Sequence, residues 1–212
     1  MRASETARRL VRRAQRAHVD LSASAVDSLV AYFELLQVWN RKINLTSLTD
    51  PDEAVDRLLL EPVVASRYVD ASAGHLLDVG SGGGSPAIPL KVMLPASRLW
   101  MVESKIRKSA FLREVVRHLG LEDAQVETAR FEELLSRPEM NESMDLVTVR
   151  AVRMDRRALL ALQAFLRPGG EVFFFTGPGG GVESILPPQL ALVGSVPLVS
   201  SLSSRLVRLR KV

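Results

Sequence analysis

A glycine-rich loop in residues 76–90, LLDVGSGGGSPAIPL, holds residue types that could bind a nucleotide-like ligand. An apolar run ends on Asp78, and glycines follow at alternate positions: Gly80, Gly82 and Gly84. Ser85 and Pro86 then open a stretch with helical spacing. A strand that turns through glycines into a helix brings backbone N–H groups close to a ligand. A simple tight turn is the alternative, but such a turn needs fewer glycines.

The spacing of this loop differs from that of the dinucleotide-binding fingerprint. That fingerprint places its third glycine three residues after the second, and Ser85 occupies this position here. The pattern Asp-x-Gly-x-Gly-x-Gly instead resembles the cofactor loop of S-adenosylmethionine-dependent methyltransferases. A nicotinamide-dependent enzyme is therefore the weakest of the functions considered.

Polar residues also follow the next two apolar runs. Glu103 and Ser104 end the run LWMVES, about twenty residues past the glycines. A carboxylate at that place can accept hydrogen bonds from both hydroxyls of a ribose. Phe131 and Glu132 follow the third run, where an adenine ring would stack and be read at its edge. A solvated strand end for Glu103 and a helix start at Ser104 are the alternatives.

Arg150 ends a fourth apolar run, DLVTVRA, and Thr176 ends a fifth, EVFFFT. An arginine that follows a buried strand is costly to bury without a partner, so a specific role is favoured over a surface ion pair. In an open α/β sheet, ligands lie beyond the carboxyl ends of the strands. All these residues are therefore expected at one edge of a sheet.

The elements that position these residues alternate along the second part of the chain. Strands are predicted at 75–79, 98–102, 124–128, 144–149 and 171–176, with helices near 86–94, 105–119, 131–136 and 155–166. Two further strand-like runs at 190–199 and 204–211 could form an antiparallel hairpin. The alternation predicts an α/β fold with a mostly parallel seven-stranded sheet, a C-terminal antiparallel hairpin and an N-terminal helical extension. The resemblance of the glycine loop implies that this is a Rossmann-like class I methyltransferase fold.

The helical extension is predicted over residues 1–70, and the methyltransferase domain over 71–212. Ser24, with Asp27 three residues later, resembles a capping box at the start of a helix. Asp50 followed by Pro51 is a stronger start signal. Pro62 is expected to kink or end the helix that follows.

Composition describes an ordinary globular protein. The 212 residues are 47% hydrophobic and 25% charged, with no apolar run long enough for a membrane span. The arginine-rich start lacks the apolar segment of a secretory signal. The chain has no cysteine and three scattered histidines, so we expect no metal site and a cytoplasmic location.

Positive charge gathers at the two ends of the chain. Residues 1–20 contain six arginines and two acids, a net charge of +4 that equals the formal net charge of the whole chain. The last eight residues, RLVRLRKV, form a second basic cluster. Two basic ends on an otherwise neutral body favour a polyanion partner, most simply RNA. A solvated helix face and a solvated edge strand are the alternative reading.

The chain resembles the bacterial ribosomal RNA small subunit methyltransferase G family, also called glucose-inhibited division protein B. Four segments between residues 29 and 177 carry this resemblance, in order: Trp39-Asn40 with Asn44-Leu45-Thr46, the glycine loop with its Pro86-x-Ile88-Pro89-Leu90 tail, Arg107-Lys108 with Phe111-Leu112, and Val149-Arg150-Ala151. Plain core packing by Trp39 and Leu45 is an alternative explanation of the first segment alone.

The resemblance implies transfer of a methyl group from S-adenosylmethionine to N7 of one guanosine in 16S rRNA, in the decoding-region loop. It implies that Arg150 is the catalytic residue, without a role in proton transfer. It also implies a cofactor-binding set: Asp78, Gly80, Gly82, Gly84, Ser85, Glu103, Ser104, Phe131, Glu132 and Arg150. The implied partner is 16S rRNA or the small ribosomal subunit, contacted by the basic N-terminal helix and C-terminal strand of a monomer.

The chain departs from the family pattern on the expected substrate face. Arg57 and Leu60, followed by Glu61, stand where the family has a histidine and an aspartate; Val149 replaces a serine, and Thr176 replaces a lysine. Because these positions lie near the acceptor, two alternatives stay open. One is a methyltransferase of another RNA or of a small molecule, and the other is a non-catalytic RNA-binding relative.

Overall fold

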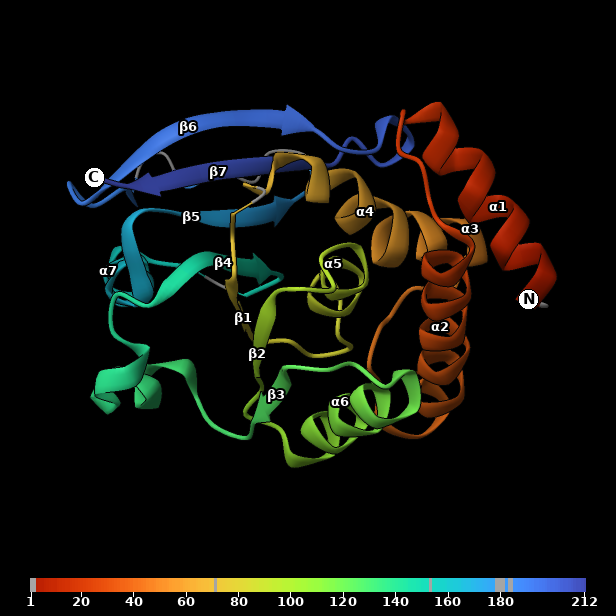
Figure 1. Ribbon diagram of the computed structural model, residues 1–212, viewed down its shortest axis with the longest axis horizontal. Helices are drawn as coiled ribbons and strands as arrows, with labels where there is room; N and C mark the ends of the chain where they lie inside the picture. Colours follow the sequence, from red (N-terminus) through yellow and green to blue (C-terminus); the bar gives the residue numbers. More distant parts are fainter. Residues whose placement is uncertain (1–2, 71, 153, 178–181, 183–184) are drawn as a thin grey trace.

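The computed structural model describes residues 3–70, 72–152, 154–177, 182 and 185–212. Its centre is one seven-stranded sheet with the strand order β3-β2-β1-β4-β5-β7-β6 (Figure 1). The strands are β1 (His75–Val79), β2 (Arg98–Val102), β3 (Ala124–Glu127), β4 (Met144–Arg150), β5 (Leu166–Thr176), β6 (Leu190–Pro197) and β7 (Arg205–Lys211). The first five pair in parallel, whereas β7 runs antiparallel to both β5 and β6. The predicted fold, including the C-terminal hairpin, is confirmed.

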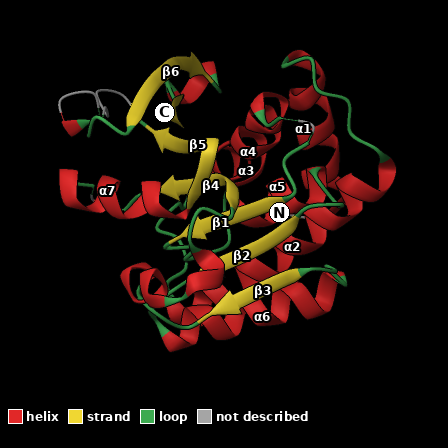
Figure 2. Cartoon of the chain, turned by 60° about the vertical axis from the view of Figure 1, so that its left-hand side comes forward, coloured by secondary structure: helices red, strands yellow, loops and turns green. Residues whose placement is uncertain are grey.

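Helices cover both faces of this sheet, as Figure 2 shows for α7 on one side and α2, α4 and α5 on the other. They are α1 (Ala3–Arg16), α2 (Ala23–Ile43), α3 (Pro51–Val55), the π-helical turn η1 (Asp56–Leu60), α4 (Glu61–Ala65), α5 (Ala87–Met93), α6 (Ile106–Leu119) and α7 (Arg156–Phe165). Short 3₁₀ turns complete the set: η2 (Ser66–Tyr68), η3 (Phe131–Ser136), η4 (Pro138–Met140) and η6 (Ser200–Leu202).

The two hydrophobic cores follow from the alternation of side chains along the strands. Leu76 packs with the N-terminal helices, α5 and α6, whereas its neighbour Leu77 packs with α7 on the other face. Because parallel strands are covered on both faces, they are apolar along most of their length. Helices from residues 3–68 share the first core with the sheet. The predicted boundary at residue 70, between a helical extension and a methyltransferase domain, stays a prediction.

Helix starts follow local capping chemistry. Asp50 caps α3 by accepting a hydrogen bond of 2.7 Å from the Glu53 N–H, as predicted. The expected cap at Ser24 is wrong: Ser22 caps α2, and its Oγ accepts from the Ala25 N–H at 3.1 Å. Within the described ranges, the structure contains no helix with the length and apolar character needed to cross a membrane.

Candidate functional site

The glycine loop follows β1, and its backbone conformation favours glycine. Gly80, Gly82 and Gly84 all have positive φ, at 71°, 52° and 88°. A Cβ atom on Gly80 would lie 2.6 Å from Val152 Cγ2, so any other residue there would force the Val152 side chain to shift. The N–H groups of Gly80 and Ser81 both donate to the carbonyl of Val102, at 2.9 and 3.0 Å. The loop is therefore fixed against the end of β2.

The N-terminal helices hold the other side of this loop. The Tyr32 hydroxyl donates to the Gly83 carbonyl at 2.6 Å, and burial raises the pKa of Tyr32, which keeps the hydroxyl protonated. Asn40 Oδ1 accepts from the N–H groups of Leu45 and Thr46, at 2.6 and 2.8 Å. Asn44, which ends α2 in the left-handed region, completes this turn. The segment Trp39–Thr46 thus shapes the loop that faces the glycines.

Glu103 connects the end of β2 to the glycine loop. Its carboxylate accepts from the Gly82 N–H at 2.9 Å and from the Lys105 N–H at 2.7 Å. Each carboxylate oxygen keeps a second lone pair for a ligand. Glu103 therefore both fixes the loop and presents acceptor capacity at the strand ends.

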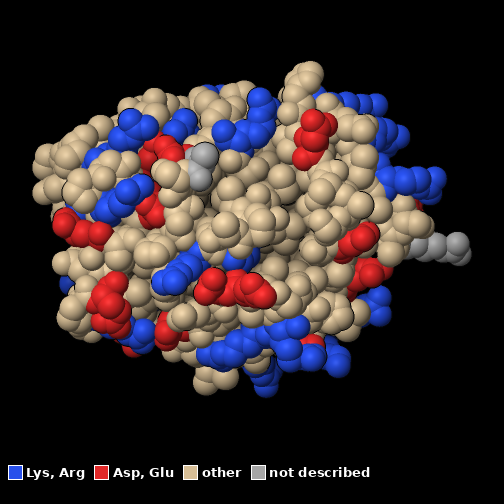
Figure 3. Space-filling model, viewed as in Figure 1, with Lys and Arg blue, Asp and Glu red and all other residues tan. Residues whose placement is uncertain are grey.

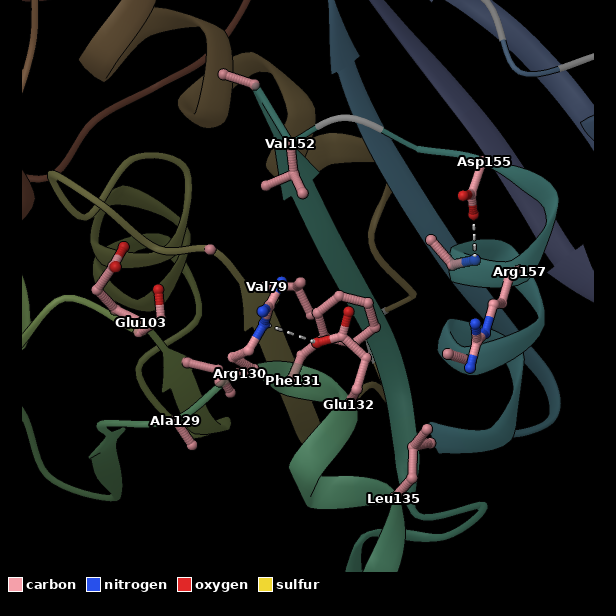
Figure 4. Close-up of a pocket in the computed structure, with 16 residues that line it drawn as sticks. Val79, Glu103, Ala129, Arg130, Phe131, Glu132, Leu135, Val152, Asp155 and Arg157 are labelled. Atoms are coloured by element: carbon pink, nitrogen blue, oxygen red, sulfur yellow. Dashed lines mark hydrogen bonds and ion pairs between the residues drawn. The ribbon is translucent and has the colours of Figure 1, made fainter.

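A first cavity of about 970 Å³ opens beside Glu103. Figure 4 shows Glu103 on one side, Asp155 and Arg157 on the other, and the residues around Phe131 between them. Its lining is Val79, Gly80, Val102, Glu103, Ser104, Ala129, Arg130, Phe131, Glu132, Leu135, Ala151, Val152, Asp155, Arg157, Ala158 and Ala161. The mixture of apolar walls and a few carboxylates suits a nucleoside.

A second cavity of about 490 Å³ lies on the other side of the glycine loop. It shares the residues Gly80, Glu103 and Ala151 with the first cavity. Its lining adds parts of the N-terminal helices and of β5: Leu36, Leu45, Thr46, Ser47, Leu48, Arg57, Leu58, Glu61, Ser81, Gly82, Gly83, Ser85, Lys108, Arg150, Phe175, Thr176 and Gly177. Two cavities that meet at one wall can hold two reactants.

Arg150 is fixed in the second cavity by contacts from three directions. Its Nη2 lies 2.8 Å from Glu61 Oε2, and its Nη1 donates to the carbonyl of Arg57. The guanidinium also lies over the ring of Phe175, 4.6 Å from the ring centre. Burial lowers the pKa of Arg150, and the negative charge of Glu61 opposes this effect.

The irregular helix around η1 supplies the carbonyl groups for these contacts. In its π register, the Glu61 N–H donates to Asp56 O, five residues back. Pro62 has no N–H group, so it cannot donate a helical hydrogen bond to the carbonyl of Arg57 or to that of Leu58. Arg150 bonds to the first of these carbonyls, and Ser85 Oγ donates to Leu58 O at 2.9 Å. The helix continues past Pro62 to Ala65, so the expected end at Pro62 is wrong; the proline instead leaves these two carbonyls free for Arg150 and Ser85.

Asp78 is buried behind the loop. Thr148 Oγ1 donates to Asp78 Oδ1 at 2.5 Å, while Oδ2 has no hydrogen-bond partner among the described residues. Burial raises the pKa of Asp78 to about 6, against the smaller opposing effect of the Thr148 hydrogen bond. The residue lines neither cavity.

The structure brings most of the predicted site residues to the two cavities. Ser104, Phe131 and Glu132 line the first, Gly82, Ser85 and Arg150 line the second, and Gly80 and Glu103 line both. Asp78 and Gly84 line neither cavity: Gly84 packs against Ile88, Leu112 and Tyr32, which leave little room for a Cβ atom. Their assignment to the cofactor, like the rest of the site, stays a prediction.

Some lining residues are absent from the predicted site. Glu61 lines the second cavity, whereas the neighbouring Leu60 is buried in the core, so an acid is present on this face after all. Phe175 also lines this cavity, one residue before Thr176, the end of β5 that the sequence indicated. Side chains alternate along a strand, so Phe175 could have been expected on the opposite face from the buried Phe174. The loop Leu45–Leu48 could not be placed without the tertiary fold.

The basic ends of the chain differ in how their charges are used. On β7, Arg208 and Arg210 both bond to Glu171, and Lys211 bonds to Glu142 at 2.7 Å. On α1, Arg9 and Arg13 pair with acids of α3 and η1. The exposed arginines of α1 follow one another at four-residue spacing and make no ion pair within the described residues: Arg8, Arg12 and Arg16.

Solved structures with a similar fold define the class. Crystal structures of a SAM-dependent methyltransferase from Aquifex aeolicus and of TrmN from Thermus thermophilus match with TM-scores of 0.59 and 0.55. The Aquifex structure is 15% identical to this chain, and the match covers 79% of this chain and 97% of that structure. The Thermus structure is 24% identical, and the match covers 71% of this chain and 49% of that structure. The chain therefore has the Rossmann-like fold of this class of methyltransferases.

Sequence comparison then gives the family. The family model described as rRNA small subunit methyltransferase G matches residues 25–181. A relative from Desulfitobacterium hafniense (strain Y51), named ribosomal RNA small subunit methyltransferase G, is 32% identical over 84% of this chain and 73% of its own length. A relative of the same name from Xylella fastidiosa (strain M23) is 46% identical over 55% of this chain. The match spans 54% of the Xylella relative's length. The chain belongs to the rRNA small subunit methyltransferase G family.

Proposed function

We propose that this protein transfers a methyl group from S-adenosylmethionine to N7 of a guanosine in 16S rRNA of the small ribosomal subunit. The observation that supports this most directly is the shared wall of Gly80, Glu103 and Ala151 between two cavities. A donor in one cavity and an acceptor base in the other would meet there. The family to which the chain belongs supplies the class of substrate.

The residues of the first cavity fit S-adenosylmethionine. The Glu103 carboxylate has acceptor capacity for the ribose hydroxyls, and Phe131 and Glu132 offer a ring and an acidic edge to adenine. Gly80 lines both cavities, and its lack of a side chain leaves the backbone accessible between them. When bound, S-adenosylmethionine supplies a methyl group on a positively charged sulfur.

The protein's own task in this reaction is alignment. Guanine N7 carries a free lone pair at neutral pH, so no residue has to remove a proton. Arg150, fixed by Glu61, Arg57 and Phe175, gives the acceptor cavity a rigid wall. A fixed wall and the exclusion of water are what such a displacement needs.

The surface that contacts rRNA is proposed to include the outer stripe of α1. Arg8, Arg12 and Arg16 are exposed, and α1 packs against η1, whose Arg57 lines the second cavity. The predicted contact through β7 has weaker support, because three of its cations already form ion pairs with Glu171 and Glu142. Since the proposed substrate belongs to the ribosome, a cytoplasmic location and action as a monomer are part of the proposal.

Two measurements test this function. In calorimetry, the protein should bind S-adenosylhomocysteine and should not bind NADH. With tritium-labelled S-adenosylmethionine, it should label 16S rRNA in 30S subunits from a strain that lacks the family enzyme, and strand cleavage at N7-methylguanosine should map one site. Cofactor binding without transfer to any RNA would instead support the non-catalytic relative, and label at another atom would point to a different substrate.

A further inference from the structure

Glu61 is a buried acid whose carboxylate is only half used. It is 2% exposed, and its Oε2 pairs with Arg150 Nη2 at 2.8 Å. Its Oε1 lies 3.8 Å from Arg57 Nη1 and has no hydrogen-bond partner among the described residues. Because a buried oxygen without a partner is costly, Glu61 Oε1 points to a ligand that donates hydrogen bonds.

Arg150 presents the opposite capacity beside it. Its Nε and Nη2 also have no hydrogen-bond partner among the described residues, because the 2.8 Å ion pair with Glu61 is not aligned as a hydrogen bond. Both residues line the second cavity and not the first. An acceptor and a donor therefore stand next to each other in the cavity proposed for the acceptor base.

Of the common bases, guanine alone offers two adjacent donors to the carboxylate beside an acceptor for the arginine along a single edge. Guanine presents two adjacent donors, N1–H and the 2-amino group, beside the acceptor O6. Adenine has an acceptor at N1, which a carboxylate would repel, and uracil offers a single donor. Cytosine has an unprotonated acceptor at N3 beside its one amino group. Carboxylates recognise such donor edges, and arginine recognises carbonyl acceptors.

We propose that the second cavity is a guanine-binding site in which Glu61 accepts from N1–H and the 2-amino group and Arg150 donates to O6. This inference rests on the proposed function and adds the residue that selects the base. Guanine N7 lies on a different edge of the ring from N1 and the 2-amino group. A base held by Glu61 therefore turns N7 away from Glu61, which leaves it free to face the shared wall at Gly80 and Ala151.

The test examines the hydrogen bond between the Glu61 carboxylate and the 2-amino group of guanine. The acceptor guanosine, once mapped, is replaced by inosine, which lacks only the 2-amino group, in rRNA assembled into 30S subunits. For the unaltered protein, kcat/KM should fall about 10- to 100-fold, the usual effect of losing a hydrogen bond to a charged group. For Glu61→Gln, kcat/KM on guanosine should fall by a similar factor, and the further penalty for inosine should shrink to about 3-fold or less.

Glu53→Gln is the matched control, because Glu53 also pairs with Arg57, at 3.6 Å, but does not line the cavity. This variant should keep the full inosine penalty. Binding of S-adenosylhomocysteine should be unchanged in both variants, which shows that the fold and the cofactor cavity are intact. If Glu61→Gln does not fold, the fall in kcat/KM of the unaltered protein on inosine still tests whether the 2-amino group is recognised.

The outcomes separate the two proposals. Methyl transfer with equal rates on guanosine and inosine overturns the guanine site alone, as does an inosine penalty that is the same in Glu61→Gln and the unaltered protein. Absence of transfer to any rRNA by the unaltered protein overturns the proposed function, and the guanine site falls with it.

Discussion

Arg150 and Glu61 form a buried ion pair whose two charges depend on each other. Their side chains are 13% and 2% exposed, so neither charge is compensated by bulk water. A buried pair of this kind adds little net stability, but loss of one partner leaves a charge alone in a low-dielectric site. The pair therefore serves geometry, since it fixes Arg150 beside Phe175 and the shared wall of the cavities.

This dependence predicts the effect of removing one charge. Arg150→Met should lower the free energy of unfolding by about 3–5 kcal/mol, and Glu61→Gln combined with Arg150→Met should recover part of that loss. Urea denaturation of the single and double variants measures both effects. Arg117→Met, which breaks the exposed pair with Glu114, should leave stability almost unchanged. Additive losses in the double variant would contradict the coupling.

Asp78 predicts a distinctive pH dependence of stability. Burial raises its pKa from 3.8 to about 6 in the folded protein, so the folded state binds this proton more tightly than the unfolded chain. The stabilisation is complete below about pH 4 and is lost as pH rises through about 6, an effect of about 3 kcal/mol. Asp78→Asn carries no such proton. Its unfolding free energy relative to the unaltered protein should therefore rise between pH 4.5 and 7.5, and parallel pH profiles would refute the assignment.

The helix that contains Pro62 shows how a local irregularity builds the site. Pro62→Ala would restore an N–H group where the carbonyls of Arg57 and Leu58 now bond to Arg150 and Ser85. The new N–H should compete for these carbonyls and loosen Arg150. We expect a fall in kcat of about 10-fold, with stability unchanged or raised, because a proline inside a helix is unfavourable. Pro51→Ala, at the first turn of α3, is the control that should leave kcat unchanged.

The same helix marks what the sequence could and could not predict. Strand ends such as Glu103 were predictable, because a run of apolar residues stops there and parallel strands align their carboxyl ends. The cap at Ser22 was missed, since Ser24 two residues later has equal capping chemistry. Glu61 was noted only as a neighbour of Leu60. Its place in the cavity depends on the π register of η1, and local periodicity does not reveal that register.

Across the whole molecule, positive charge is divided between ion pairs and free surface. Figure 3 shows Lys and Arg side chains gathered over α1 and over α6. The sequence alone gave the N-terminal and C-terminal clusters equal weight as RNA contacts. In the folded chain, Arg208 and Arg210 belong to a compact cluster with Glu171, whose side chain is 13% exposed. Tertiary pairing, which sequence spacing does not reveal, separates structural cations from available ones.

This division predicts which arginines control binding to rRNA. Arg12→Gln combined with Arg16→Gln should weaken binding to 30S subunits and lower the slope of log affinity against log salt by about 1–2, because up to two phosphate contacts are lost. The free energy of unfolding should not change, since both side chains are exposed and make no ion pair within the described residues. Arg208→Gln combined with Arg210→Gln removes the same charge but should lower stability and leave the salt slope unaltered, because Glu171 loses its partners. Filter binding across a salt series, paired with urea denaturation, measures both quantities. If the β7 pair changes the salt slope and the α1 pair does not, rRNA lies over the C-terminal hairpin instead of α1.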